Sequence, residues 1–201
     1  DNNNCSYKEC CVESEGGSSG SGSDLGDCVY DQSQKGKIVE VRETIFVKSG
    51  QVYDGKGCTI KAIGLGDGGQ GENQQKIFKL EKGATLRNLR IAAPGADGVG
   101  FTDDCLIENV VWEDVGEDAM STSSGSGNAK ITVINCEFRN ASDKAIQFNT
   151  NADLYLINCY FKNVATPIRS HHQIDLYISN CKFEKCNYVS LLTGGKAKDK
   201  T

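Results

Sequence analysis

The chain has 201 residues, with 23 glycines, 2 prolines, 10 cysteines and a formal net charge of −5. This length suits one domain with its own hydrophobic core, and the negative charge argues against a general nucleic-acid or anionic-membrane binder. No stretch approaches 18 uncharged apolar residues, so we predict no membrane-spanning helix.

The first 36 residues are polar and contain cysteines and the flexible run GGSSGSGSD. We predict an arm over residues 1–36, disordered or tethered by disulfides. An even number of cysteines, with Cys10 next to Cys11, indicates an oxidising compartment and disulfide bonds rather than zinc, because no C-x-x-C pair occurs. Since the sequence starts at Asp1 without methionine, we expect a processed, secreted form.

A repeat organises the chain after the arm. Short motifs such as INCEF, INCYF and SNCKF place asparagines at intervals of 21 to 26 residues, at Asn88, Asn109, Asn135, Asn158 and Asn180. A period of this size, in a sequence rich in strand-forming residues, indicates a solenoid.

Apolar residues hold fixed places on both sides of each asparagine. Four residues before it lie Ala84, Cys105, Ile131, Leu154 and Leu176, and three after it lie Ile91, Trp112, Phe138, Phe161 and Phe183. Alternation with a period of two predicts strands with one buried face, and stacked asparagines can bond to one another at the bend. We therefore predict an all-β fold, a right-handed parallel β-helix of about 22 residues per coil, over residues 37–195, with a charged tail at 196–201.

A polar column is expected nine residues after the ladder asparagines. The residues there are Asp97, Asp118, Lys144 and Pro167, with Glu117 beside Asp118. Stacked coils lie about 4.8 Å apart, so three carboxylates would meet and would repel one another unless a cation is present. Oxygen ligands of this kind suit Ca²⁺. The alternative is a solvated face on which Lys144 simply offsets Asp118.

The segment 43–169 resembles the pectate lyases of polysaccharide lyase family three. The resemblance rests on ETIFVKSGQVYDGKG, FKLEKGATLRNLRI, ADGVGFTDDCLIENVVWEDVGEDA, ASDKAIQFN and PIRS. It implies a parallel β-helix and a secreted, Ca²⁺-dependent enzyme that cleaves polygalacturonate, an acidic plant-type polysaccharide, by β-elimination.

The resemblance also implies roles for single residues. Asp97, Glu117 and Asp118 match calcium-binding carboxylates, and Glu72 matches a cleft glutamate that contacts substrate. Lys144 and Arg169 match basic catalytic residues. We assign Lys144 as the base and Arg169 as the clamp on a substrate carboxylate, although these roles could be exchanged.

Three positions depart from the family pattern. Thr166 stands at a substrate-binding position where the family commonly has a lysine, ADGVGF replaces a version with histidine and cysteine, and SHHQ replaces a cysteine-containing loop. They leave open a second function, a catalytically impaired β-helix that binds glycans or builds extracellular filaments. Filaments would form through the open solenoid ends or the N-terminal arm.

Other motifs lead to smaller predictions. Asn4 and Asn140 lie in N-x-S/T sequons and are candidate glycosylation sites. The adjacent His171 and His172 would point opposite ways on a strand, so we expect a role at the cleft edge rather than a metal site. GLGDGGQG, residues 64–71, lacks the lysine of a phosphate-binding loop and is interpreted as a long turn.

Three cysteines, Cys136, Cys159 and Cys181, follow ladder asparagines and would stack on adjacent coils. Their spacing permits a disulfide between neighbours, and buried free thiols are the equal alternative.

Overall fold

The chain folds into strands that stack along one axis. A computed structural model describes residues 12–13, 36–116, 118–122, 127–192 and 198–199. These residues form strands β1 to β18 and contain no helix, and hence none long and apolar enough to cross a membrane. Most of the arm predicted for residues 1–36 lies outside the described residues.

Three parallel sheets build the wall of the solenoid. The first contains β2 (Ile38–Val41), β5 (Thr59–Ala62) and β16 (Lys182–Glu184). The second contains β3 (Ile45–Val47), β6 (Phe78–Leu80), β8 (Val99–Phe101), β10 (Met120–Thr122) and β17 (Ser190–Leu192). The third contains β4 (Val52–Asp54), β11 (Ala129–Ile134), β13 (Ala152–Ile157), β15 (Ile174–Ser179) and β18 (Lys198–Asp199).

Long strands bend at the corners and join two sheets each. Strands β7 (Ala84–Ile91) and β9 (Cys105–Trp112) pass from the third sheet to the first, and β12 (Glu137–Phe148) and β14 (Tyr160–Ser170) pass from the first to the second. Only the short β1 (Val12–Glu13) pairs antiparallel, with β4, among the described strands.

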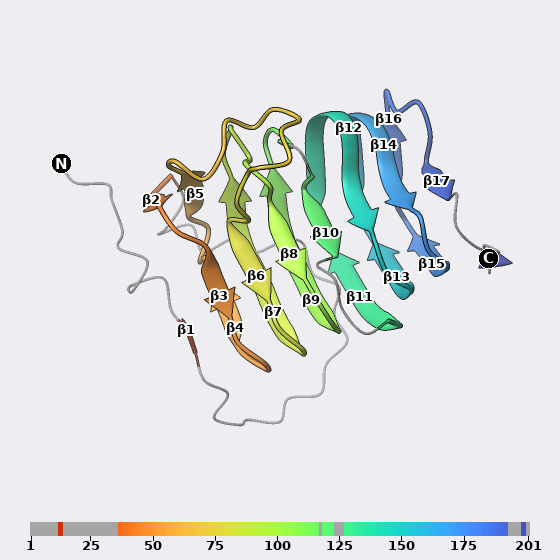
Figure 1. Cartoon of the computed structure of the whole chain (residues 1–201), viewed down its shortest axis with the longest axis horizontal. Coiled ribbons are helices and arrows are strands. Elements are labelled where there is room, and N and C mark those ends of the chain that lie inside the picture. Colours follow the sequence, from red (N-terminus) through yellow and green to blue (C-terminus); the bar gives the residue numbers. More distant parts are fainter. Residues whose placement is uncertain (1–11, 14–35, 117, 123–126, 193–197, 200–201) are drawn as a thin grey trace.

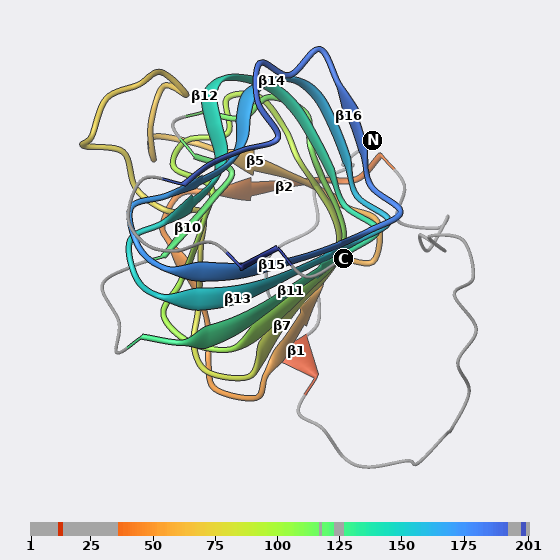
Figure 2. The ribbon, with the colours of Figure 1, turned by 90° about the vertical axis from the view of Figure 1, so that its right-hand side faces the viewer.

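The coils run in chain order along the molecule. Figure 1 shows successive strands side by side from β2 to β17, and Figure 2, turned by 90°, shows the closed outline that the coils share. Bonded ladder asparagines lie 21, 22 and 23 residues apart. The prediction of a parallel β-helix with about 22 residues per coil is confirmed.

Buried aromatic rings stack along the inside of the wall. Trp112, Phe138, Phe161 and Phe183 form a ladder with centroid separations of 4.6, 4.6 and 5.1 Å. The first three of these side chains have no exposed surface. Because the two inner rings, Phe138 and Phe161, are each covered by a neighbouring ring on both faces, the ladder fixes the register between coils as well as burying apolar area.

The predicted asparagine ladder is present at the corner between the third and first sheets. All five asparagines have a left-handed backbone, with φ from 53° to 57°. Asn109 Nδ2 donates to Asn88 Oδ1 at 2.9 Å, Asn158 Nδ2 to Asn135 Oδ1 at 3.1 Å, and Asn180 Nδ2 to Asn158 Oδ1 at 2.7 Å. Asparagine suits this corner because it tolerates the left-handed conformation and bonds along the stack.

Substitutions at Asn158 separate the contribution of the left-handed backbone from that of the amide hydrogen bonds. Asn158→Gly keeps the left-handed backbone but removes two amide hydrogen bonds, so we expect it to lower the free energy of unfolding by about 1–3 kcal/mol. Asn158→Ala adds the left-handed backbone cost and should lose about 1–2 kcal/mol more. Urea unfolding of both variants and the parent measures the difference. Equal stability of the two variants would contradict the backbone contribution.

The cysteines of the described residues are free thiols. Cys58, Cys105, Cys136, Cys159, Cys181 and Cys186 form no disulfide. Burial raises the pKa of the Cys105 thiol, and Cys159 Sγ lies 3.4 Å from the backbone oxygen of Val133. The disulfide prediction is therefore wrong for these six residues, and for Cys136, Cys159 and Cys181 the alternative of free thiols holds. Four of the six are buried core side chains, and Cys181 and Cys186 are partly buried. The other four cysteines lie outside the described residues.

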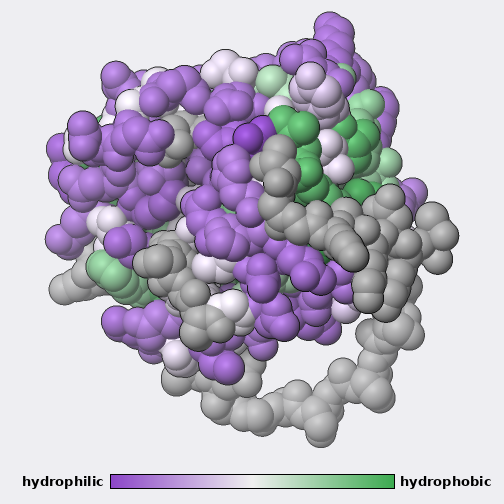
Figure 3. All heavy atoms as spheres, turned by 45° about the vertical axis from the view of Figure 1, so that its right-hand side comes forward, coloured by the Kyte–Doolittle hydropathy of each residue, from purple (hydrophilic) through white to green (hydrophobic). Residues whose placement is uncertain are grey.

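Hydrophobic side chains reach the surface at both ends of the solenoid. Ile38 and Phe46 are exposed on the first coil, and Ile178, Tyr188 and Val189 on the last. Figure 3, with the C-terminal end brought forward, shows hydrophobic atoms gathered on one side of a mostly hydrophilic surface. Ile38 and Phe46 alternate with buried residues of β2 and β3, so they lie on the outer face of the first coil.

Candidate active-site cleft

A column of polar residues lies just before the strands of the second sheet. Phe78 pairs with Val99, Val99 with Met120, and Met120 with Ile146. The residues two places earlier therefore stack, and Lys144 pairs directly with the next member, Thr166. We call this set the polar column: Lys76, Asp97, Asp118, Lys144 and Thr166.

The stacking predicted for Asp97, Asp118 and Lys144 is present, but the count of nine residues fails on the next coil. Counting nine residues from the asparagine gives Pro167, whereas the structure pairs Thr166 with Lys144. The register between β12 and β14 shifts between Ala141 and Lys144, so β14 reaches the column one residue sooner. Such a bulge cannot be located by counting from a single reference residue.

The column opens into a cleft of about 570 Å³. Glu72, Asp97, Asp118, Lys144 and Arg169, all predicted, line it, and His171 also borders it. The sequence did not predict the other lining residues: Lys76, Ser121, Thr122, Asp143, Gln147 and Asn149. Thr166 is largely buried beside Lys144, so its predicted substrate contact stays a prediction.

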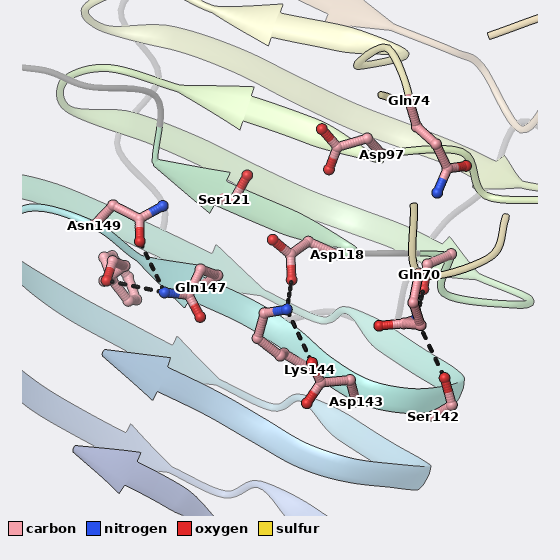
Figure 4. Close-up of polar contacts among 12 residues, drawn as sticks. Gln70, Gln74, Asp97, Asp118, Ser121, Ser142, Asp143, Lys144, Gln147 and Asn149 are labelled. Atoms are coloured by element: carbon pink, nitrogen blue, oxygen red, sulfur yellow. Dashed lines mark hydrogen bonds and ion pairs between the residues drawn. The ribbon is translucent and has the colours of Figure 1, made fainter. Parts of the chain in front are cut away.

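Lys144 is held between two carboxylates. Its Nζ lies 3.0 Å from Asp143 Oδ2 and 3.5 Å from Asp118 Oδ1, as Figure 4 shows. The side chain of Lys144 is 18% exposed and that of Asp118 only 5%. A pair with so little solvent is weakly screened, so its geometry is better defined than that of a surface ion pair.

A second lysine, Lys76, is the first member of the column. Lys76 Nζ lies 2.5 Å from Asp97 Oδ1 and 2.5 Å from Ser121 Oγ, with the Lys76 and Asp97 side chains 13% and 14% exposed. The sequence reading missed Lys76 because no ladder asparagine precedes it by nine residues, where Asp67 stands. Its spacing of 21 residues from Asp97, equal to the Asp97 to Asp118 spacing, is the signal that could have revealed it.

A second row of outward side chains forms the cleft floor. Ser121 pairs with Gln147, and Gln147 with Arg169, on β10, β12 and β14. Gln147 Nε2 donates to Asn149 Oδ1 at 2.9 Å (Figure 4). Ser121 and Gln147 are almost fully buried, so Arg169 is the part of this row that reaches solvent in the cleft.

The loop between β5 and β6 closes one side of the cleft. Gln70 Nε2 donates to the backbone oxygen of Gly116 at 3.1 Å and to Ser142 Oγ at 3.2 Å (Figure 4). Within the loop, Gln74 Oε1 accepts a hydrogen bond from the backbone N–H of Gly68 at 2.8 Å. The run 64–71 is thus a long turn, as predicted, and the loop carries Glu72 to the cleft.

Gly98 permits the close stacking of the two aspartate coils. Its φ is +52°, and a Cβ there would lie 2.2 Å from the backbone oxygen of Ala119 and 2.4 Å from that of Asp118. No larger residue fits without moving these backbones. Gly98 therefore keeps Asp97 and Asp118 on adjacent rungs of the column.

The donor set fits a hard cation in part. Asp97 and Asp118 offer carboxylate oxygens on adjacent coils of one cleft, which are ligands that Ca²⁺ prefers. The third predicted ligand, Glu117, lies outside the described residues. Among the residues that the structure describes, no cluster of three or more histidine, cysteine or acidic side chains is arranged to hold a metal. Both aspartates instead pair with lysines.

The sequon residue Asn140 belongs to a second asparagine ladder. It is exposed, with φ of 60°; its Nδ2 donates to the Glu113 backbone oxygen at 3.0 Å, and its Oδ1 accepts from Asn163 Nδ2 at 3.2 Å. Glycosylation of Asn140 stays a prediction, and Asn4 lies outside the described residues.

Comparisons with known proteins identify the family of the chain. The family model for pectate lyase matches residues 30–192. A probable pectate lyase E from Aspergillus clavatus is 35% identical over 140 residues, covering 69% of this chain and 53% of that protein. A probable pectate lyase G from Emericella nidulans is 34% identical over 120 residues, covering 58% and 45%.

A comparison with solved structures gives a further likeness. The catalytic domain of pectate lyase PelI from Erwinia chrysanthemi aligns with a TM-score of 0.48 and 24% identity, covering 81% of each chain. The chain matches about half the length of the curated relatives named above. Because the family model covers most of the chain, from the first sheet to β17, the chain belongs to the pectate lyase family.

Proposed function

We propose that the protein is a secreted, calcium-dependent pectate lyase that cleaves polygalacturonate by β-elimination. The observation that supports it most is the cleft in which Lys144 and Arg169 lie with Asp97 and Asp118. Basic groups beside candidate calcium ligands suit an anionic polymer, despite the net charge of −5. Secretion follows from this substrate, because a long polysaccharide is met outside the cell.

The proposed reaction needs one base and no water. The C5–H bond breaks, its electron pair forms the C4–C5 double bond, and the C4–O bond to the next sugar breaks. The leaving oxygen takes the C4–O electron pair and accepts one proton from the protonated base or from solvent, which balances the proton lost from C5. Lys144 Nζ, as the neutral amine, would accept the C5 proton, and Arg169 would hold the substrate carboxylate on which negative charge develops. Ca²⁺, when held by Asp97 and Asp118, would supply Lewis-acid withdrawal of charge from that carboxylate.

To act as the base, Lys144 would have to lose at least part of its present ion pairing. Its ammonium group is held by Asp118 and Asp143, and carboxylates at this distance favour the charged form of an amine. Engagement of the Asp118 carboxylate by a cation would remove one of these partners. Lys144 and the proposed calcium ligand are thus coupled through a single carboxylate.

A second function has its own observation. Thr166 supplies no cation beside Lys144, and hydrophobic side chains are exposed on both end coils. These features suit a β-helix that binds glycans or associates end to end without turnover.

Turnover separates the two functions. We expect the folded protein with polygalacturonate and Ca²⁺ to release unsaturated product, measured by its ultraviolet absorbance, and a chelator to stop the release. Restoring excess Ca²⁺ should restore the rate, which controls for damage by the chelator. Folded protein that gives no product at any Ca²⁺ concentration, and that self-associates in sedimentation, would contradict the enzyme and favour the structural function.

A further inference from the structure

Lys76 forms an ion pair with Asp97, one of the two described carboxylates of the proposed calcium site. Its Nζ contacts Asp97 Oδ1 and Ser121 Oγ, each at 2.5 Å. Ser121 lies on the coil after Asp97, so the ammonium group bridges two coils of the column rather than extending into solvent. A long side chain that is 13% exposed and bonded at both coils has a defined position in the cleft.

The four charged members of the polar column lie in a symmetric order of charge, before Thr166. Lys76 pairs with Asp97, and Lys144 pairs with Asp118, so the order along the column is cation, anion, anion, cation. Each carboxylate therefore pairs with a lysine, and the Lys76 ammonium group also reaches Ser121 on the coil of Asp118. This arrangement relieves the repulsion between Asp97 and Asp118 without an added ion.

The same oxygen cannot serve both cations equally. A divalent ion bound at Asp97 would lie close to the Lys76 ammonium group, and like charges in a cleft with little solvent repel strongly. The ammonium group would then have to leave Asp97, and Ser121 alone offers it a weaker, uncharged acceptor.

We infer that Lys76 is an internal competitor of Ca²⁺ at Asp97 and thereby sets the calcium affinity of the cleft. The inference rests on the proposed function in one respect, that Asp97 belongs to the calcium site. In this role Lys76 opposes calcium binding, so the parent protein binds calcium more weakly than a protein with the same carboxylates but without the Lys76 charge. By linkage, bound calcium must release Lys76 from Asp97 to the same extent that Lys76 weakens calcium binding.

Removal of the Lys76 charge tests this role directly. Lys76→Met keeps the aliphatic chain, and we expect it to lower the Kd for Ca²⁺, measured by titration calorimetry without substrate, by about tenfold or more. Lys79→Met is the matched control, because it removes the same charge from the exposed side of β6, three residues away. Its Kd should stay within about twofold of the parent. Lys76→Gln, which can still hydrogen bond, gives a second test should the methionine variant fold poorly.

Amine labelling of the parent gives an independent readout. Acylation of Lys76, mapped by mass spectrometry, should increase when Ca²⁺ is added, whereas that of Lys79 should not change. Equal or weaker calcium binding by both Lys76 variants, or protection of Lys76 by calcium, would overturn the inference. Absence of calcium binding in every variant would overturn it too. Tighter binding without lyase turnover would keep this inference and contradict the proposed function instead.

Discussion

Replacement of Lys144 by alanine should lower kcat for polygalacturonate by about 10²-fold to 10⁴-fold, the contribution typical of a general base. Lys144 is the column lysine that lies beside the Asp118 carboxylate and opens to the cleft that Arg169 also lines. Alanine removes both the proton acceptor and the ion pairs with Asp118 and Asp143. Initial rates of ultraviolet absorbance at saturating Ca²⁺ measure the loss.

Lys144→Arg separates the base from the ion pair. Arginine keeps the charge near Asp118 but stays protonated, so we expect this variant to remain as inactive as the alanine variant. Lys162→Ala serves as a control, since Lys162 lies on the first sheet in a loose, exposed pair with Glu184 at 3.9 Å. Its kcat should match that of the parent. Activity of Lys144→Arg near the parent value would show that the base lies elsewhere and would favour the exchanged roles, with Arg169 as the base.

Folding must be checked in the same proteins. The Asp118 side chain is 5% exposed, so loss of Lys144 leaves a carboxylate with less compensation in a poorly solvated place. Thermal unfolding and Ca²⁺ titration of Lys144→Ala show whether the cleft persists. A variant that folds, binds calcium and turns over no substrate would have lost chemistry rather than structure.

The repeat could be predicted from the sequence, but the local shifts in register between coils could not. Residues that recur once per coil, such as Asn135 and Phe138, predict the position of the corner and of the core, because every coil has the same steric requirements there. The offset that brings Thr166 rather than Pro167 beside Lys144 arises from a local register shift, which no periodic position records. Periodicity therefore predicts the coils, but it does not predict an extra residue inserted between two recurring positions.

The missed cleft residues have a second cause. Lys76 contacts Ser121 across two coils, 45 residues along the chain, and only the stacked fold brings them together. Gln70 likewise reaches Ser142 from a loop that has no counterpart in the repeat. The general disulfide prediction failed for a compositional reason: a high cysteine count is typical of disulfide frameworks, whereas four of the six described thiols are buried in the apolar core.

Truncation of the aromatic ladder should have the largest effect on stability. Phe138 is fully buried between Trp112 and Phe161, with ring centroids 4.6 Å away on both sides. We expect Phe138→Ala to lower the free energy of unfolding by about 3–5 kcal/mol, from the lost burial and the cavity left between two rings. That is a large part of the roughly 5–15 kcal/mol typical of a domain. Urea unfolding followed by circular dichroism measures it.

Two further variants show which interaction the ladder contributes. Phe138→Leu keeps most of the buried apolar area but loses both stacking contacts, so it should cost about 1–3 kcal/mol. Phe46→Ala removes the same side chain from an exposed position on the first coil and should cost less than about 1 kcal/mol. A cost of less than 1 kcal/mol for Phe138→Ala would contradict the ladder as a stabilising element. Because Phe138 and Lys144 lie on the same strand, β12, a loss of register at the ring would also displace the lysine from the polar column.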